Sequence, residues 1–288
     1  MSAEIPAVIR GAGERADATT HRTALITGAS GGIGLEMTRL LAADGYNIVI
    51  IGRDGKRLEA VAIELQTRFP VSVRSEVWDL SEPRMAFGLW NALTAAGIAV
   101  DILVNNAGVG MYGAVEEQDA SELDRMVQLN IGALTTLTRL VLPGMLQRYW
   151  GRILNVASVV AYQPGGPRMA AYYATKAYVL SFSRGLAREL RDTGVSITVL
   201  SPGPTETAFD DKAGASVDTL YKRAPKMSAA AVARAGYEGM LRQSREVIPG
   251  LMTKVLAVAG EFSPRPIGLE VNRLLWAASP KTAPSTKK

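Results

Sequence analysis

The stretch TALITGASGGIG, residues 23–34, joins a short apolar run to three glycines, Gly28, Gly32 and Gly34. Gly28 permits a tight turn, Gly32 lets the backbone approach a pyrophosphate, and Gly34 allows a helix to pack closely on the strand. The N-terminus of that helix would present free amides and the positive end of its dipole to a phosphate. A glycine-rich turn without a ligand is the alternative. The position between a first strand and a first helix favours a dinucleotide site.

Working outward from this stretch, five more β-rich apolar runs follow along the chain. The six predicted strands are 23–28, 46–52, 71–80, 100–108, 151–158 and 195–203. Segments with the apolar period of a helix lie between them, for example Leu58, Val61 and Leu65. This alternation predicts an α/β protein with a doubly wound parallel sheet of the Rossmann type, covered by helices on both faces in three layers. We expect all six strands to be buried.

The organisation of the chain predicts one domain. No linker interrupts residues 23–203 and no repeat of fixed period is present, so we expect a single domain over 23–280. A flexible N-terminal arm, 1–22, and a basic tail, 281–288, would flank it. Residues 204–245 turn to polar and small side chains near the carboxyl edge of the sheet. They are either a substrate lid or a surface excursion.

The composition excludes several kinds of chemistry. The chain has no cysteine and one histidine, His21, so disulfides, thiolate chemistry and a histidine metal cluster are excluded, and we expect no metal site. The net charge of +5 is spread along the sequence, which does not favour a nucleic-acid partner. No apolar run reaches the ~18 to 20 residues of a membrane span, and the first 22 residues lack the apolar core of a signal peptide. We therefore expect a cytoplasmic protein without a transmembrane segment.

The end of the second predicted strand bears on the choice of dinucleotide. In IIGRD, residues 50–54, Gly52 stands where a carboxylate would meet a ribose 2′-hydroxyl, and Arg53 follows it. A cation suits a 2′-phosphate, so the stretch predicts NADP(H), with NAD(H) as the alternative because Asp54 is close. Arg53 could also be an ordinary surface arginine at the end of a strand.

The stretch YYATK, residues 172–176, contains candidate catalytic groups. On a helix, Tyr172 and Lys176 lie one turn apart on the same face. Tyr173 is also within reach of Lys176, so spacing alone leaves both tyrosines open. A lysine ammonium close to a phenol would lower the phenol pKa towards the working range of a proton donor.

Together, the glycine spacing of residues 27–34 and YxxxK resemble the short-chain dehydrogenase/reductase family over about residues 22–250. The resemblance implies that Tyr172 is the proton donor and that Lys176 lowers its pKa and holds the nicotinamide ribose. Ser158 would donate to a substrate carbonyl, and Asn130 would hold a water that relays protons to the lysine. A structural asparagine is the alternative for Asn130, which lies on an otherwise apolar helical stripe.

The family pattern also implies a set of cofactor contacts, in which Asp79 meets the adenine, the NNAG turn flanks the adenine ribose, and Thr207 contacts the nicotinamide amide. The full set is Gly28, Ser30, Gly31, Gly32, Ile33, Gly34, Arg53, Asp79, Leu80, Asn106, Ala107, Gly108, Tyr172, Lys176, Pro202, Gly203, Thr205 and Thr207.

The reaction implied is hydride transfer between NADPH and a carbonyl or alcohol carbon. We expect a small and fairly apolar substrate, such as a ketone, a steroid-like molecule or a 3-oxoacyl group. The candidate pocket walls, which could equally be core, are Val159, Val160, Tyr162, Met169 and 204–225. A non-catalytic NADP-sensing protein and an epimerase or dehydratase on the same fold are the alternatives.

Two features concern assembly and surfaces. Family members usually form dimers or tetramers through the helices that correspond to 118–148 and 170–192, and we expect a homodimer or homotetramer here. The segment 248–276 is apolar enough to cover the substrate site, to bind a partner chain or to touch a membrane surface. The loop from Ser158 to Tyr172 has one residue more than is usual in the family, which affects the shape of the predicted pocket.

Overall fold

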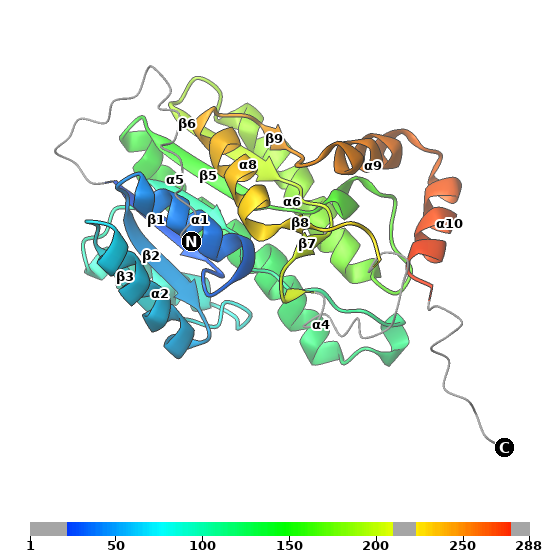
Figure 1. Ribbon diagram of the computed structural model, residues 1–288, viewed down its shortest axis with the longest axis horizontal. Coiled ribbons are helices and arrows are strands. Elements are labelled where there is room, and N and C mark those ends of the chain that lie inside the picture. Colours follow the sequence, from blue (N-terminus) through cyan, green and yellow to red (C-terminus); the bar gives the residue numbers. More distant parts are fainter. Residues whose placement is uncertain (1–21, 210–222, 278–288) are drawn as a thin grey trace, which may run out of the picture.

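The computed structural model describes residues 22–209 and 223–277, and its centre is a seven-stranded sheet. The strands, in the order in which they lie in the sheet, are β3 (Val73–Val77), β2 (Asn47–Gly52), β1 (Thr23–Thr27), β4 (Ile102–Asn105), β5 (Gly151–Val156), β6 (Val195–Leu200) and β9 (Glu246–Val247). Every neighbouring pair is parallel. The order reverses between β1 and β4 (Figure 1), and residues that follow these two strands line a crevice at their carboxyl ends. The predicted α/β doubly wound fold is confirmed.

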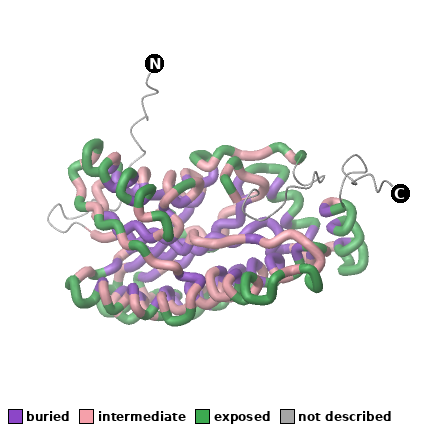
Figure 2. Tube along the Cα trace, turned by 90° about the horizontal axis from the view of Figure 1, so that it is seen from below, coloured by how far each residue is buried: buried purple, intermediate pink, exposed green. Residues whose placement is uncertain are grey.

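Helices cover both faces of the sheet in three layers, and Figure 2 shows the buried sheet between two more exposed layers. One face carries α1 (Gly32–Ala43), α2 (Gly55–Arg68) and α8 (Ala229–Leu241), and the other carries α3 (Met85–Ala95), α5 (Leu134–Gln147) and α6 (Ala170–Glu189). Alternating residues of β1 supply both cores: Ala24 and Ile26 pack under α1, whereas Leu25 packs under α3 and α5. The near-continuous apolar run of this strand follows from burial on both sides.

One predicted strand differs from expectation. β3 is mostly half-exposed or exposed, and Val77 is 60% accessible, so the prediction that all six strands are buried is wrong for this one. β3 lies at the edge of the sheet and pairs only with β2. Its charged residues, Arg74 and Glu76, form a salt bridge that faces solvent.

The segment 204–245, expected to be either a lid or a surface excursion, contains a helix that packs in the core. Its later part forms α8, which packs against α1 and buries Val232, Tyr237 and Met240 in the core. The small residues have a packing role, because a Cβ on Gly236 would lie 2.7 Å from the Leu200 side chain. The short pair of β7 (Thr205–Glu206) and β8 (Met227–Ser228) remains beside the crevice.

The remaining helices lie at the carboxyl side of the sheet and at the C-terminal end of the described chain. They are η1 (Val115–Glu117), α4 (Ala120–Val127), a π-helix (Gln128–Ala133), η3 (Val159–Tyr162), α9 (Leu251–Phe262) and α10 (Arg265–Leu275). Among the described residues, only Ala120–Gln147 is long and apolar enough to span a membrane. Leu137, Val141 and Met145 of this segment are buried in the core, as in the core helix of a globular fold.

Parts of the predicted arm, lid and tail lie outside the described residues. These parts are 1–21, 210–222 and 278–288. Arg22, assigned to the arm, is held in place: its guanidinium lies 3.7 Å from the centroid of the Trp150 ring. Its carbonyl accepts a hydrogen bond from the Asn47 amide.

Candidate active site

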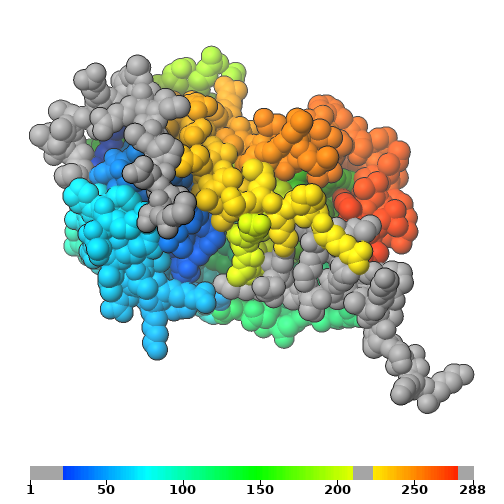
Figure 3. Space-filling model, viewed as in Figure 1, coloured from blue at the N-terminus to red at the C-terminus, as the bar shows by residue number. Residues whose placement is uncertain are grey.

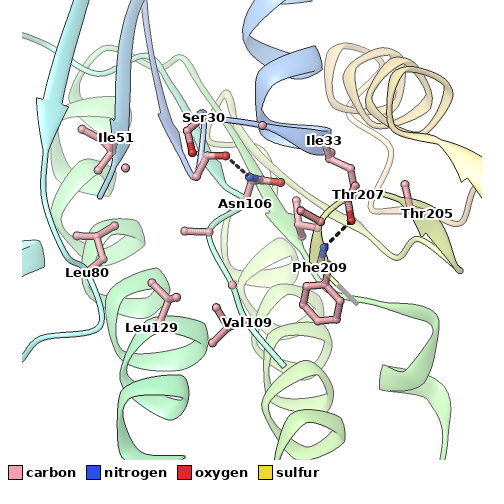
Figure 4. Close-up of a pocket in the computed structure, with 18 of the residues that line it drawn as sticks. Ser30, Ile33, Ile51, Leu80, Asn106, Val109, Leu129, Thr205, Thr207 and Phe209 are labelled. Carbon is pink, nitrogen blue, oxygen red and sulfur yellow. Dashed lines mark hydrogen bonds between the residues drawn. The ribbon is translucent and has the colours of Figure 1, made fainter. Parts of the chain in front are cut away.

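One cavity collects nearly all the residues that the sequence singled out. It lies at the carboxyl ends of the parallel strands, with the β7 segment on one side (Figure 4). The predicted residues that line it are Gly28, Ser30, Gly31, Gly32, Ile33, Arg53, Asp79, Leu80, Asn106, Ala107, Gly108, Ser158, Tyr172, Lys176, Pro202, Gly203, Thr205 and Thr207. Gly34 and Asn130 are the two that do not line it.

The glycines of the first turn have distinct physical roles. Gly28 and Gly32 have φ values of +68° and +57°, a region that other residues rarely adopt. A Cβ on Gly34 would lie 2.4 Å from the Gly28 carbonyl oxygen, so this glycine permits the close contact of helix and turn, as predicted. A Cβ on Gly31 would meet nothing within 4 Å. The turn is therefore closely packed behind and open towards the cavity.

The N-terminus of α1 is suited to a phosphate. It has no side-chain cap and no acidic residue in its first turn, whereas Asp54, Asp119 and Ser228 cap α2, α4 and α8. The first-turn amides of a helix have no partner within the helix, and an anion can satisfy them. An uncapped, glycine-lined helix start beside the cavity fits the pyrophosphate of a dinucleotide.

We expect Gly34→Ala to destabilise the fold itself. The added methyl would collide with backbone, which should lower the free energy of unfolding by roughly 1–3 kcal/mol. Thermal or denaturant unfolding of the protein without cofactor measures this change. Gly31→Ala is the matched control, because its methyl has room and its φ of 176° suits any residue. Equal losses in both variants would contradict the packing role of Gly34.

The charges around Arg53 define the end of the cavity near β2 and β3. Asp79 accepts a hydrogen bond from Arg125 at 2.8 Å and lies 3.8 Å from the Arg53 guanidinium. Burial would raise the pKa of Asp79, but hydrogen bonds from Ser81 and the two arginines outweigh it and hold the pKa below its usual range. The Arg53 side chain is 56% accessible and lines the cavity, so it can meet an added anion.

Asp54 is engaged with α2 and does not line the cavity. Its carboxylate caps α2 by accepting from the Arg57 amide at 3.1 Å and pairs with the Arg57 side chain at 3.3 Å. Arg57 also lines the cavity, and sequence reasoning missed it. Its signal was its position one turn into the helix that starts after Arg53, where a second cation faces the same end of the cavity.

The NNAG turn is joined to the glycine turn by side-chain hydrogen bonds. The Asn106 amide nitrogen donates to the carbonyl oxygens of Thr27 and Gly28 at 3.0 and 3.1 Å. The Thr27 hydroxyl accepts from the backbone amides of Asn106 and Ala107. These bonds hold the two cavity-lining turns of β1 and β4 at a fixed separation.

Ser158, Tyr172 and Lys176 lie together at the other end of the cavity. Each is at most 7% accessible. Ser158 follows β5 and caps η3, while Tyr172 and Lys176 share one face of α6. The Lys176 Nζ lies 5.8 Å from the centroid of the Tyr172 ring and donates to the Val156 carbonyl at 2.9 Å. The arrangement brings a serine hydroxyl, a phenol and an amine to one site.

The lysine is strongly affected by its surroundings. Burial lowers the pKa of Lys176 from 10.5 to about 8. Its amine can therefore exchange its proton near neutral pH, and any anion that binds beside it would favour the charged form.

The neighbouring tyrosine is placed differently. The Tyr173 hydroxyl accepts a hydrogen bond from the Trp276 indole nitrogen at 2.8 Å, and burial raises the pKa of Tyr173 to about 12. Tyr173 does not line the cavity, whereas Tyr172 does. Tyr173 therefore connects α6 to the end of α10, and the geometry selects Tyr172 for the site.

Asn130 lies behind the cavity in the π-helix. Its side-chain oxygen accepts from the Val109 amide at 3.0 Å, and its nitrogen donates to the Val109 carbonyl and the Thr175 hydroxyl at 2.9 and 3.1 Å. These hydrogen bonds fix the segment after β4 beside Lys176, which is a structural role for the side chain. The water relay that the family resemblance implies for Asn130 stays a prediction.

Four of the predicted pocket walls belong to the core. Val159, Val160, Tyr162 and Met169 are at most 6% accessible and pack in one apolar cluster, and none lines the cavity. The Tyr162 hydroxyl donates to Glu246 at 2.9 Å, which turns the ring away from the site. The sequence could not separate a wall from the core because both are apolar. Of the predicted wall 204–225, residues 210–222 lie outside the described chain.

Several apolar residues that sequence reasoning missed line the cavity, among them Val109 and Leu129. Phe209, from the predicted wall 204–225, lines it too. The Phe209 ring lies 5.4 Å from the Tyr172 ring, centroid to centroid, at an angle of 48°. The phenol therefore faces a partly apolar space.

Comparisons with known proteins agree with this site. A sequence model of the family described as short chain dehydrogenase matches residues 22–218. A ketoacyl reductase of Nostoc sp. is 30% identical and covers 85% of this chain and 86% of its own length. A short-chain dehydrogenase from Sphingobium yanoikuyae, solved in complex with NADPH, has 34% identity, a TM-score of 0.73, and coverage of 83% of this chain and 92% of its own. A bulky-bulky ketone specific alcohol dehydrogenase from Comamonas testosteroni has 33% identity, a TM-score of 0.70, and coverage of 81% and 88%.

The chain belongs to the short-chain dehydrogenase family. The predicted family and the prediction of an oxidoreductase acting on CH–OH or C=O groups are confirmed. The cytoplasmic location, the oligomeric state and the individual roles of the site residues stay predictions.

Proposed function

We propose that this protein is an NADP(H)-dependent reductase or dehydrogenase of apolar ketones and the corresponding secondary alcohols. The observation that carries the proposal is the placement of Ser158, Tyr172 and Lys176 at one end of a cavity whose other end carries the glycine turn and Arg53. A non-catalytic sensor has no use for a buried phenol beside a buried amine. That combination favours turnover over sensing.

The cofactor of this protein is NADP(H). When it is bound in the cavity, it supplies the hydride that is exchanged with the substrate carbon. The α1 N-terminus and the glycine turn would hold its pyrophosphate, and Arg53 and Arg57 would hold its 2′-phosphate. Lys176 would hold its nicotinamide ribose. The complex of the Sphingobium relative with NADPH supports this choice.

Four residues of this chain have separate roles in the proton transfer. Tyr172 donates a proton to the carbonyl oxygen in reduction and takes it back in oxidation. Ser158 donates a hydrogen bond to the same oxygen, which stabilises the charge that develops on it. Lys176 in its charged form lowers the pKa of the Tyr172 phenol. Asn130 is a positioning residue that holds the loop beside Lys176 through Val109 and Thr175.

We expect Arg53→Ala to separate the two cofactors. Loss of a charge-assisted contact of ~1.5–3 kcal/mol should raise the Kd for NADPH by about tenfold or more and leave the Kd for NADH nearly unchanged. Fluorescence titration with each cofactor measures this. Arg125→Ala is the matched control, because Arg125 also pairs with Asp79 but does not line the cavity. The same selective loss in both variants would mean that the effect arises through Asp79.

The apolar character of the substrate rests on Val109, Leu129 and Phe209 around the phenol. The ketone-specific relative from Comamonas testosteroni supports it, while the ketoacyl reductase of Nostoc favours a 3-oxoacyl substrate as a second candidate. The test is NADPH consumption, followed by absorbance, with small ketones, bulky aryl and steroid ketones, and 3-oxoacyl thioesters. We expect the bulky ketones to have the highest kcat/KM. Absence of net NADPH consumption across the panel would favour an epimerase, a dehydratase or a sensor.

We also propose that the protein is a homo-oligomer. Its interface would be formed by the long helical segments 120–147 and 170–189. These helices pack together through a hydrogen bond between Thr135 and Tyr178 at 3.0 Å. Val127, Leu146 and Tyr178 on them are partly exposed, at 37–38%. A monomer in analytical ultracentrifugation would rule this out.

A further inference from the structure

The last two helices of the described chain present their apolar residues to the outside. The fully buried residues of these helices are small or polar: Thr253, Ala257 and Gly260 in α9, and Gly268 and Asn272 in α10. At the end of α10, Leu275 is partly buried and the following Trp276 is buried against the core. The large apolar residues are 40–81% exposed: Leu251, Met252, Val255, Leu256, Val258, Phe262, Ile267, Leu269, Val271 and Leu274. We call this set the apolar hairpin surface. Its amphipathic pattern is the reverse of that of a helix whose apolar face meets a core.

Specific contacts on the inner side set this orientation. The Asn272 side chain donates to the Gly165 carbonyl at 2.6 Å, and the Gln163 side chain donates to the Leu256 carbonyl at 2.9 Å. A Cβ on Gly260 would lie 2.8 Å from the Tyr162 carbonyl oxygen, so this glycine permits the close approach of the helix to backbone. Turning α9 or α10 to bury its leucines would break these contacts. The apolar surface therefore belongs to the folded protein.

The two helices pack against the loop between Ser158 and Tyr172, which carries the extra residue. Pro164 contacts Gly268, and Gly165 accepts from Asn272. Arg184 of α6 holds Glu261 of α9 at 2.9 Å. The hairpin is thus fixed to the rest of the protein, and it forms one end of the molecule in Figure 3, coloured orange to red.

Ten exposed apolar residues on two adjoining helices form a larger apolar area than a surface in water usually keeps, since exposed apolar residues are normally scattered singly. Elsewhere in the described chain, exposed side chains such as Ile63, Val77 and Phe87 belong to separate elements, α2, the edge strand β3 and α3. The apolar hairpin surface therefore indicates a binding surface for an apolar partner.

The charge around the hairpin identifies the kind of partner. In the described part of this segment, 251–277, the basic residues Lys254, Arg265 and Arg273 outnumber two Glu, and the sequence beyond it adds Lys281, Lys287 and Lys288 and no acidic residue. Both acids are already paired, Glu261 with Arg184 and Glu270 with Arg273. An apolar surface with a surplus of cations matches an anionic lipid bilayer, in which apolar side chains enter the interface and cations meet the headgroups.

We propose that α9 and α10 dock this protein on an anionic membrane surface. The chain would lie on the membrane without crossing it, with the apolar hairpin surface in the headgroup and upper acyl region. A second copy of the chain is the less favoured occupant, because a two-fold contact would bring together two segments that each carry more basic than acidic residues. Docking is a binding property, and it does not depend on the proposed reaction.

The test uses the full chain and vesicles. Co-sedimentation is measured with vesicles of phosphatidylcholine alone and of phosphatidylcholine mixed with phosphatidylglycerol. We expect partitioning onto the mixed vesicles to be about tenfold stronger or more, and to weaken as salt is raised. Lys281→Gln combined with Lys287→Gln and Lys288→Gln should reduce this preference.

The apolar contribution is tested by Leu251→Gln combined with Phe262→Gln and Leu274→Gln, which should reduce vesicle binding by about tenfold or more. The matched control is Ile63→Gln combined with Phe87→Gln, which removes exposed apolar residues from α2 and α3 and should leave binding unchanged. Circular dichroism and unfolding curves check that both variants are folded.

Three outcomes would overturn the proposal. The first is no binding of the wild-type protein to either kind of vesicle. The second is equal loss in the hairpin variant and in the control variant. The third is a hairpin variant that becomes a smaller species in ultracentrifugation without lipid while its vesicle binding is unchanged, which would assign the surface to a second copy of the chain.

Discussion

Tyr172→Phe is expected to lower kcat/KM for ketone reduction by about 10³-fold, within the ~10²–10⁴ that proton transfer from a positioned side chain contributes. Phenylalanine keeps the ring and its contact with Phe209 but removes the only atom that can carry the proton. NADPH consumption measures the loss. The Kd for NADPH should change little, because the ring still fills its place in the cavity.

Tyr173→Phe is the matched control, one residue along the same helix. It removes a hydroxyl that accepts from Trp276, so it should lower the free energy of unfolding by about 1–3 kcal/mol and leave kcat within a few-fold of wild type. The ranking of the two variants decides the assignment. If Tyr173→Phe abolished turnover and Tyr172→Phe did not, the proposed proton donor would be wrong.

Lys176→Met should have the second largest effect, a loss of about 10²-fold or more in kcat, because the phenol would lose the cation that lowers its pKa. Methionine has similar length and is apolar, so it suits a position that is 5% accessible. Steady-state kinetics at saturating NADPH measure the loss.

Lys176→Met should also change how the free energy of unfolding depends on pH, which can be measured independently of activity. The pKa of Lys176 in the folded protein is about 8, below its ordinary value of 10.5, so between these values the unfolded chain binds more protons. The contribution of this lysine to the free energy of unfolding therefore rises as the pH increases from about 8 to 10.5, by on the order of 3 kcal/mol. Below that window the buried charge disfavours folding.

Denaturant unfolding of wild type and Lys176→Met, without cofactor, across this pH range measures the difference. The variant should gain most over wild type at the low end of the window, and its advantage should shrink as the pH rises. Subtracting the two curves removes the contribution of buried tyrosines. Lys254→Met, at an exposed lysine, is the control and should show no such trend. A difference that is constant with pH would contradict the depressed pKa of Lys176.

Much of the fold could be predicted because its signals are local. The apolar run before Gly28, the glycine spacing and the repeated strand and helix periods each depend on neighbours in sequence, and they predicted the doubly wound sheet. The edge position of β3 could not be predicted. Its alternation is compatible with burial, and only the pairing of strands shows that nothing covers its outer side.

The residues of the candidate site also fall into two groups, those that the sequence predicted and those that it did not. Residues at the ends of strands and one turn apart on α6 are brought together by the topology of a parallel sheet, so Ser158, Tyr172 and Lys176 could be named in advance. Val109 and Arg57 could not, because their access to the cavity depends on how loops and helices pack. Small residues in α8 had the composition of a loop and proved to be sites of close helix packing.

By itself, the sequence determined the family, the sheet and the polar groups of the site, because the backbone needs of a phosphate turn and the spacing on one helix are written in adjacent residues. The spacing on α6 left two tyrosines open, the family pattern implied Tyr172, and the tertiary structure showed that Tyr172 lines the cavity. Only the tertiary structure decided which apolar residues are wall or core, and which side of α9 and α10 faces outwards. Those facts depend on contacts between residues far apart in the chain, such as Trp276 with Tyr173 and Asn272 with Gly165.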